Sequence, residues 1–183
     1  MPVVIGLIIV IAVIVIVFYN GLQVAQNNVK NAWSQIDVQL QRRFDLIPNL
    51  MEAIKGYMDH EEGILTKITE LRSLWANSQT VSEKSKLNND LSSSLKTIMA
   101  ISENYPILRA SENFLNLQNE LRNTEEKIAV VRGEYNDAVT KYNIKLETVP
   151  SNLIAGIFGF KEEELFKLEN EDVKKNVKID FSK

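Results

Sequence analysis

The chain opens with one uninterrupted apolar run, VVIGLIIVIAVIVIVF, from Val3 to Phe18. No polar side chain interrupts these sixteen positions, and the next charged side chain is that of Lys30. As an α-helix the run measures roughly 24 Å, near the short limit for crossing a hydrocarbon core of about 30 Å. Tyr19 follows at the edge, where interfacial aromatic side chains are common. We therefore predict a retained membrane anchor over residues 1–19, with Gly6 inside the span.

Three other interpretations of this run fit less well. A cleaved signal peptide needs a cationic start and a small-residue cleavage site, whereas Met1 and Pro2 supply only the α-amino charge. A buried core helix of this composition needs apolar neighbours on all sides, which a small domain does not supply. A pilin-like stem carries a glutamate five residues after its processing glycine, and this chain has Ile11 at that distance from Gly6.

The composition of the chain excludes several functional classes. Its 21 basic and 24 acidic side chains are interspersed, with a net charge of −3, so no extended basic surface is offered to a nucleic acid. The absence of cysteine excludes disulfides and thiolate metal sites. The one histidine, His60, stands beside Asp59, Glu61 and Glu62, but Ile64 occupies the position where a second metal-binding histidine would be needed. We interpret this cluster as an acidic first helical turn, and we predict no catalytic residue, metal site or cofactor.

After the anchor, apolar residues recur at alternating steps of three and four, which is typical of helices that bury one face. Pro48 should kink the first helix and Pro150 should end the last. The spacing predicts four helices, which run from the membrane to about residue 58, over 64–75, from Ser82 to about residue 105, and over 114–149.

The lengths and connections of these helices predict the fold. The first and last helices would each have about 40 residues, roughly 60 Å, and the two between them about 20. Short connections favour antiparallel neighbours. We therefore predict an all-α fold in which the transmembrane helix continues into an antiparallel up-down-up-down four-helix bundle of two long and two short helices. This bundle would occupy residues 20–149, followed by a short irregular tail over 150–183.

Two short helices cannot cover two long ones, so the membrane-near halves of the long helices should expose an apolar seam. Either the chain's own tail or another copy of the chain would cover it. The residues of this predicted interaction seam are Val29, Trp33, Ile36, Tyr135 and Tyr142. The Tyr-Asn pairs at 135–136 and 142–143 are one heptad apart, and we interpret them as packing layers.

The tail has two apolar parts. Its residues 153–160 form a cluster that fits either the headgroup boundary of a membrane or the open seam. Val177, Ile179 and Phe181 alternate with polar residues like a short strand.

Long, specific strings occur in order along nearly the whole chain. They are Tyr19-Asn20, NAWSQIDVQLQRRFDLIPNL over 31–50, EAIKGYMDHE over 52–61, SENYPILRASENFLNLQNEL over 102–121, TEEKIAVVRGEYNDAVTKYN over 124–143, and VPSN with a later Gly159-Phe160. In these strings the chain closely resembles the LemA family of bacterial membrane proteins. The resemblance implies an N-terminal membrane segment and a helical bundle in a bacterial cell membrane. It implies no agreed activity, and it favours a structural or envelope-associated role over an enzymatic one.

The polar residues around Pro48 belong to one of these strings and have two interpretations. As a family-motif surface, Arg42, Asp45, Pro48, Asn49 and Glu52 are candidates for a shared functional site. As part of the structure, Arg43 would lie opposite position 125 if the long helices are antiparallel. Arg43, Thr124 and Glu125 would then form a polar layer that fixes helix register, which is the interpretation we favour.

These features predict a non-enzymatic, single-pass membrane protein of the bacterial cell envelope that lies in the lipid bilayer and assembles into a homo-oligomer or scaffold. Because Lys30, Arg42 and Arg43 lie on the C-terminal side of the span, the soluble domain is placed on the cytoplasmic side. Two other functions are considered: an adaptor for a membrane protease or another envelope protein partner, and a hydrolase or metal enzyme.

Overall fold

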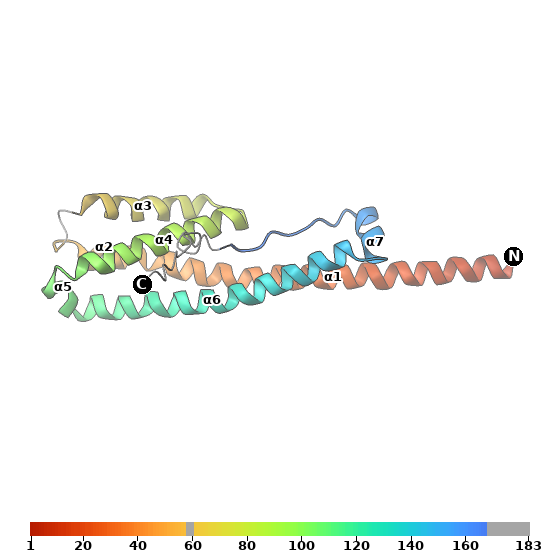
Figure 1. The fold of residues 1–183 in the computed structure, drawn as a ribbon, viewed down its shortest axis with the longest axis horizontal. Coiled ribbons are helices and arrows are strands. Elements are labelled where there is room, and N and C mark those ends of the chain that lie inside the picture. Colours follow the sequence, from red (N-terminus) through yellow and green to blue (C-terminus); the bar gives the residue numbers. More distant parts are fainter. Residues whose placement is uncertain (58–60, 168–183) are drawn as a thin grey trace, which may run out of the picture.

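The computed structural model describes residues 1–57 and 61–167, and within them every regular element is a helix (Figure 1). The prediction of an all-helical chain that begins with a long apolar helix is confirmed. Asp59 and His60, and the strand predicted over 177–181, lie outside the described residues. The helices are α1 (Pro2–Asp45), α2 (Ile47–Ile54), α3 (Glu62–Asn77), α4 (Val81–Ser102), α5 (Pro106–Ala110), α6 (Glu112–Glu147) and α7 (Ser151–Phe158).

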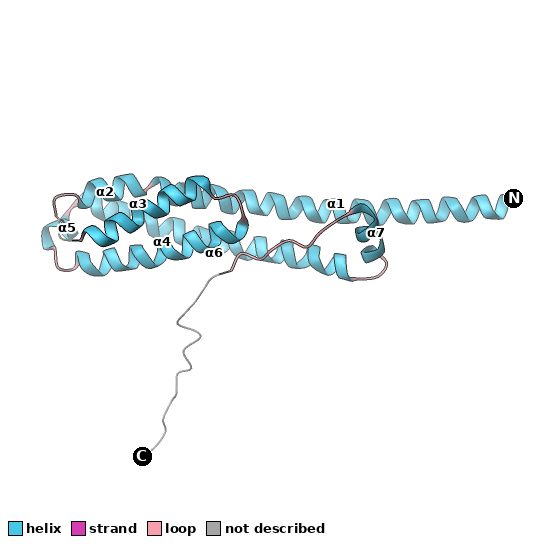
Figure 2. Cartoon of the chain, turned by 90° about the horizontal axis from the view of Figure 1, so that it is seen from above, coloured by secondary structure: helices cyan, strands magenta, loops and turns pink. Residues whose placement is uncertain are grey.

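The two long helices, α1 and α6, form the axis of a rod. They run side by side in opposite directions, while the N-terminal part of α1 projects alone beyond the end of α6 (Figures 1 and 2). Near the projecting part, the Lys145 ammonium donates to the Gly21 carbonyl at 3.2 Å. At the opposite end of the rod, here called the distal end, Arg42 pairs with Glu120 at 2.6 Å. The shorter α3 and α4 lie along the distal half of the rod only (Figure 1).

The first helix ends earlier than the spacing predicted. Instead of one kinked helix that reaches residue 58, α1 stops at Asp45 and α2 begins at Ile47. The Leu46 N–H bonds to the Arg43 carbonyl at 3.3 Å, three residues back, so the helix tightens at this point. Pro48 then stands in the first turn of α2, where its missing N–H costs no intrahelical bond.

The third predicted helix begins one residue before the expected Ser82, because a different residue caps it. The Thr80 hydroxyl accepts from the Glu83 N–H at 3.1 Å, and the Glu83 carboxylate accepts from the Thr80 N–H at 3.2 Å. This reciprocal pair is a capping box, which satisfies two backbone donors at the start of α4. The backbone hydrogen bonds hold the pKa of Glu83 below its ordinary value.

We expect Thr80→Ala to lower the free energy of unfolding by about 1 kcal/mol, since it removes the capping hydroxyl. Urea denaturation of the full chain in detergent would measure this loss. Thr66→Ala on α3, which removes a hydroxyl outside any cap, is the matched control and should change stability by less than about 0.5 kcal/mol. Equal losses in both variants would contradict the role of the cap.

The distal core is formed where α1 and α2 meet α3, α4 and α6. Phe44 and Trp75 stack with their ring centroids 4.5 Å apart. The Lys84 ammonium lies over the Trp75 ring at 4.9 Å and pairs with Asp37. A cation held over an indole face and against a carboxylate ties α4 to both α1 and α3.

The sequence predicted an irregular tail, but the tail begins with a helix. Residues 151–158 form α7, which ends at Gly159 in the left-handed region, φ 73°. The following residues, Phe160–Lys167, here called the strap, run back along the rod in an extended form (Figure 1). From the sequence, Pro150 was interpreted only as the end of the last predicted helix, whereas it is the N-cap of α7.

Candidate functional site

The projecting end of α1 is the first candidate site. Its most apolar 18-residue window has a mean hydropathy of 3.2, and no residue of that window is buried within the chain. Val3, the predicted start of the span, and Gly6 are exposed, whereas Phe18 and Tyr19 are half-buried. A long helix that exposes only apolar side chains has the length and composition of a membrane span.

The predicted interaction seam is not exposed. Val29, Ile36, Tyr135 and Tyr142 are each at most 3% accessible, and Trp33 is half-buried. The strap lies over this part of the seam, with Phe166 fully buried and its ring 6.3 Å from that of Trp33. The seam is therefore covered in the folded chain. Of the two coverings considered from the sequence, the tail folding back is the one observed.

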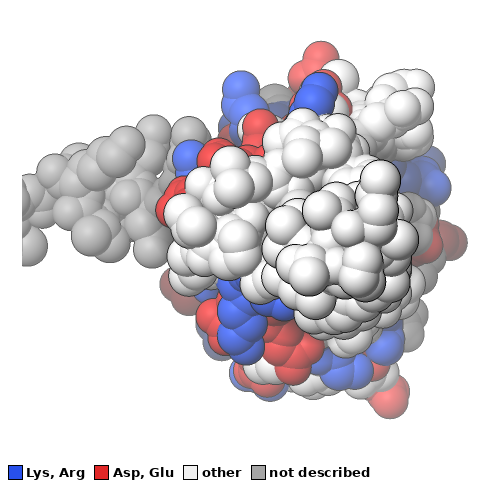
Figure 3. Space-filling view, turned by 90° about the vertical axis from the view of Figure 1, so that its right-hand side faces the viewer, with Lys and Arg blue, Asp and Glu red and all other residues white. Residues whose placement is uncertain are grey.

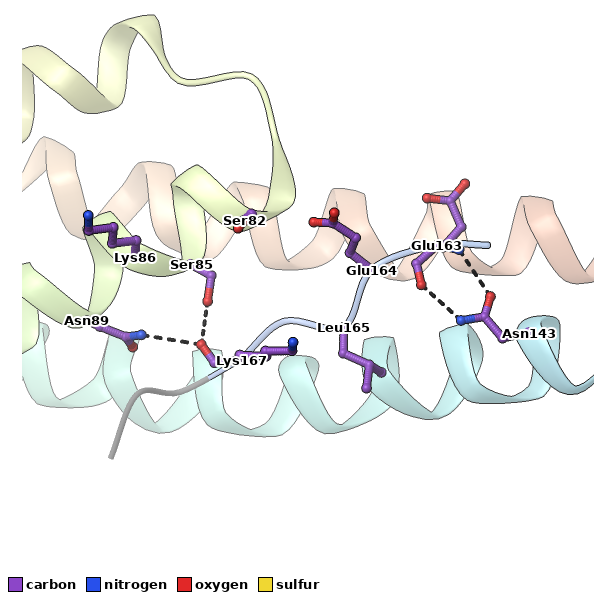
Figure 4. Close-up of a pocket in the computed structure, with 9 residues that line it drawn as sticks. All are labelled: Ser82, Ser85, Lys86, Asn89, Asn143, Glu163, Glu164, Leu165 and Lys167. Atoms are coloured by element: carbon purple, nitrogen blue, oxygen red, sulfur yellow. Dashed lines mark hydrogen bonds between the residues drawn. The ribbon is translucent and has the colours of Figure 1, made fainter. Parts of the chain in front are cut away.

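Two asparagines of α6 hold the strap by its backbone. Asn143 donates to the Glu163 carbonyl at 2.9 Å and accepts from the Glu163 N–H at 3.1 Å (Figure 4). Asn136, one heptad earlier, bonds in the same way to Phe166, at 3.2 and 2.9 Å. Each side-chain amide thus replaces the neighbouring strand that an extended segment would otherwise need.

Further contacts fix the middle and the C-terminal end of the strap. The Tyr135 hydroxyl donates to the Glu164 carbonyl at 2.7 Å. Ser85 and Asn89 of α4 both donate to the Lys167 carbonyl (Figure 4). A hollow of about 450 Å³ remains between α4 and the strap, lined by Ser82, Lys86 and Glu164 among others. The strap therefore joins α4 to α6 along the seam.

Burial of Tyr135 raises its pKa to about 12, with Glu163 and Glu164 adding to the effect. An unfolded tyrosine titrates near pH 10. Between these values the unfolded state releases its proton first, so stability should fall as pH rises from about 10 to about 12, by about 3 kcal/mol in total. Below pH 10 Tyr135 keeps its proton in both the folded and the unfolded state, so its titration does not lower the free energy of unfolding there.

Absorbance of tyrosinate at 295 nm would test this prediction. One of the five tyrosines should titrate near pH 12, and Tyr135→Phe should remove that step. Tyr142, whose pKa is also raised by burial, should still titrate late in the variant. Titration of all five tyrosines near pH 10 in the folded protein would contradict the burial of Tyr135.

The structure brings together two of the three residues of the predicted polar layer, Arg43 and Glu125, and adds partners of Arg43 that the sequence did not reveal. Arg43 is 1% accessible and approaches the Glu125 carboxylate at 3.5 Å. Its guanidinium also donates to Asn88 and Ser92 of α4, both at 2.9 Å. Desolvation lowers the pKa of Arg43, and the charge of Glu125 opposes that shift. Thr124 is buried beside the layer, but its hydroxyl bonds to the Leu121 carbonyl of its own helix.

The family-motif surface lies at the distal end of the rod and is mostly exposed. Arg42 pairs with Glu120, and Asp45 accepts from Gln41 at 2.8 Å. Asn49 and Glu52 line a hollow of about 600 Å³ between α2 and the start of α6. Pro48 is half-buried in the first turn of α2. The structure thus separates this accessible surface from the buried Arg43.

Within the described residues, no three acidic or histidine side chains are grouped as a metal site would require.

The model of the LemA family matches residues 32–181. The chain belongs to the LemA family. It is 30% identical over 137 residues to Protein LemA of Metamycoplasma hominis, a match that covers 74% of this chain and 63% of that relative. The apolar first helix and this relative indicate a membrane-associated bacterial protein.

Shorter matches connect this LemA-family chain to two magnetosome proteins. It is 36% identical over 73 residues to Magnetosome protein MamQ 2 of Paramagnetospirillum magneticum, and 33% identical over 72 residues to Magnetosome protein MamQ of Magnetospirillum gryphiswaldense. The matched regions cover 40% and 39% of this chain. They cover only 27% and 26% of those relatives.

Proposed function

We propose that this LemA-family protein is a non-enzymatic, single-pass scaffold of the bacterial cell envelope. The observation that carries the proposal is the continuity of α1, in which one 44-residue helix is both the apolar projecting end and the axis of the rod. A helix that crosses the bilayer and continues into a packed rod holds the distal end at a fixed height above the membrane. The seam is filled by the chain's own strap, which leaves the outer faces and the distal end for partners.

Self-assembly of this scaffold would use the outer face of the α1–α6 hairpin. Val24 and Ile144 are more than half exposed there and line one hollow of about 590 Å³. Copies anchored in one bilayer present this face at the same height above the membrane. The exposed apolar residues of neighbouring copies can therefore come into contact without either rod tilting. The short apolar run also favours association. When the apolar run of a helix is shorter than the hydrocarbon core is thick, association of several helices reduces the cost of the mismatch.

Crosslinking in vesicles tests this arrangement. The chain has no cysteine, so Ile144→Cys introduces the only thiol, and Leu74→Cys on α3 is a matched control of similar exposure. A short bis-maleimide should crosslink the first variant into dimers and leave the second monomeric. Equal crosslinking of both variants, or none at either position, would overturn assembly through this face.

A second function, an adaptor for another envelope protein, is favoured by the distal hollow. Asn49 and Glu52 stand there opposite Asn113 and Asn116, which offers amide and carboxylate groups to a polar partner. If this function is correct, a photo-crosslinker at Glu52 in living cells should capture one partner in a fixed ratio to the chain, and a photo-crosslinker at Ile144 should not. Capture of only a second copy of the chain from Glu52 would favour the scaffold alone.

We also propose that the rod faces the cytoplasm, from the positions of Lys30, Arg42 and Arg43 after the span. A membrane-impermeant maleimide added to whole cells should then fail to label Leu74→Cys until the membrane is opened. Labelling of intact cells would place the rod on the other side.

A further inference from the structure

The short helix α7 packs on α1 where the apolar run ends. Ile154 and Ala155 are buried with Leu22, and Val15 and Phe18 pack against the same cluster. The ring of Tyr19 is 4.8 Å from that of Phe158 and 5.8 Å from that of Phe160. Through these contacts α7 is held at one level along α1, next to residues 15–22.

The opposite side of α7 is apolar and uncovered. Leu153 and Ile157 are 63% and 75% accessible, and Val149 just before the helix is 78% accessible. Phe158, on the side that contacts Tyr19, is still 52% accessible. No charged residue occurs over 148–160. Figure 3 views the rod from its N-terminal end. Uncharged side chains cover the tip of α1 and the area above it, which is where α7 lies in Figure 1. Charged side chains surround this uncharged area.

The position of α7 agrees with the expected boundary of the bilayer. A hydrocarbon core of about 30 Å corresponds to about 20 helical residues, four more than the apolar run contains. If the core begins at Val3, it ends near Leu22, which is the residue that α7 covers. Tyr19 then lies about one helical turn inside this boundary, and the rings of Phe158 and Phe160, which contact it, lie near the same level, close to the interface where aromatic side chains are favoured.

We propose that α7 is a second membrane contact that lies at the boundary between the lipid headgroups and the acyl chains, with Leu153 and Ile157 against lipid. The proposal commits to lipid because the exposed face of α7 continues the surface of the span itself. A helix of this kind stabilises the membrane-bound state through its buried apolar area. It would also stop α1 from sliding deeper or tilting freely, since α7 is joined to the base of α6 by three residues.

Single thiols in the otherwise cysteine-free, full-length protein test this contact. Ile157→Cys on α7 is compared with Leu74→Cys on the distal α3 and with Ile16→Cys inside the span, each carrying an environment-sensitive fluorophore. The variants are reconstituted into phosphatidylcholine vesicles that contain a lipid with a nitroxide near the headgroup or deep in the acyl chain. Iodide is the aqueous quencher.

The probe at position 157 should be quenched at least threefold more strongly by the shallow nitroxide than the probe at position 74, and iodide should show the opposite order. The probe at position 16 should respond best to the deep nitroxide. Equal iodide quenching at 157 and 74 would overturn the proposal. Protection of position 157 from both iodide and nitroxide would also overturn it, because another protein surface would then cover α7. Quenching at position 157 by the shallow nitroxide is expected even if the proposed self-assembly through the α1–α6 face fails.

Discussion

Arg43→Leu should lower the free energy of unfolding by about 3 kcal/mol. The leucine would fit the surrounding core, but the buried Asn88 would lose the donor that its Oδ1 now accepts from, and Ser92 would lose the same partner. A buried polar group left without its hydrogen bond costs about 1–3 kcal/mol. The loss of the packed guanidinium volume adds to this cost.

The adjacent Arg42 supplies the control for that measurement. Arg42 pairs with Glu120, but both side chains are nearly half exposed, so Arg42→Leu should cost no more than about 1 kcal/mol. Replacing the layer as a whole, with Arg43→Leu, Asn88→Leu and Ser92→Ala together, should recover much of the loss, because no buried polar group is then left alone. If denaturation shows equal losses for Arg42→Leu and Arg43→Leu, the buried layer does not carry the stability assigned to it.

Phe166→Ala should release the strap from the seam without unfolding the rod. The phenyl ring is 1% accessible and packs between the two long helices, and its removal costs about 3 kcal/mol of strap binding. Local opening should therefore become roughly 100-fold more frequent. The backbone amides of Glu163 and Phe166, which now donate to Asn143 and Asn136, should exchange with deuterium faster by that factor.

Leu165→Ala is the matched control for strap release, since Leu165 is the adjacent apolar residue but is 41% accessible. It should change the exchange of the same two amides by less than about threefold. The double variant Asn136→Ala, Asn143→Ala should accelerate exchange as Phe166→Ala does. Unchanged exchange in the double variant would show that the asparagines do not hold the strap.

The parts of the fold that follow from local pattern could be predicted from the sequence. The apolar first helix and the long α6 are confirmed, because each is a single periodic segment with no competing signal. The pairing of Arg43 with Glu125 followed from an antiparallel register alone. The end of α1 at Asp45 was missed because Pro48 fits a kink and a helix start equally well in sequence.

The strap and the partners of Arg43 could not be predicted, because they depend on contacts between distant residues. Asn88 and Ser92 lie in a stretch without family strings, and only the structure shows that they face α1. A signal for the strap did exist in the two Tyr-Asn pairs one heptad apart. We interpreted them as packing layers, whereas their asparagines bind the backbone of Glu163 and Phe166.

We propose that this LemA-family protein assembles within the membrane as a scaffold. The most direct test is the native mass of the full-length chain released from lipid nanodiscs, measured over a range of protein-to-lipid ratios. The account predicts discrete complexes at a fixed multiple of the 20.8 kDa chain, which persist when the protein is diluted in lipid and which Ile144→Asp dissociates. A single chain at every ratio would contradict the claim.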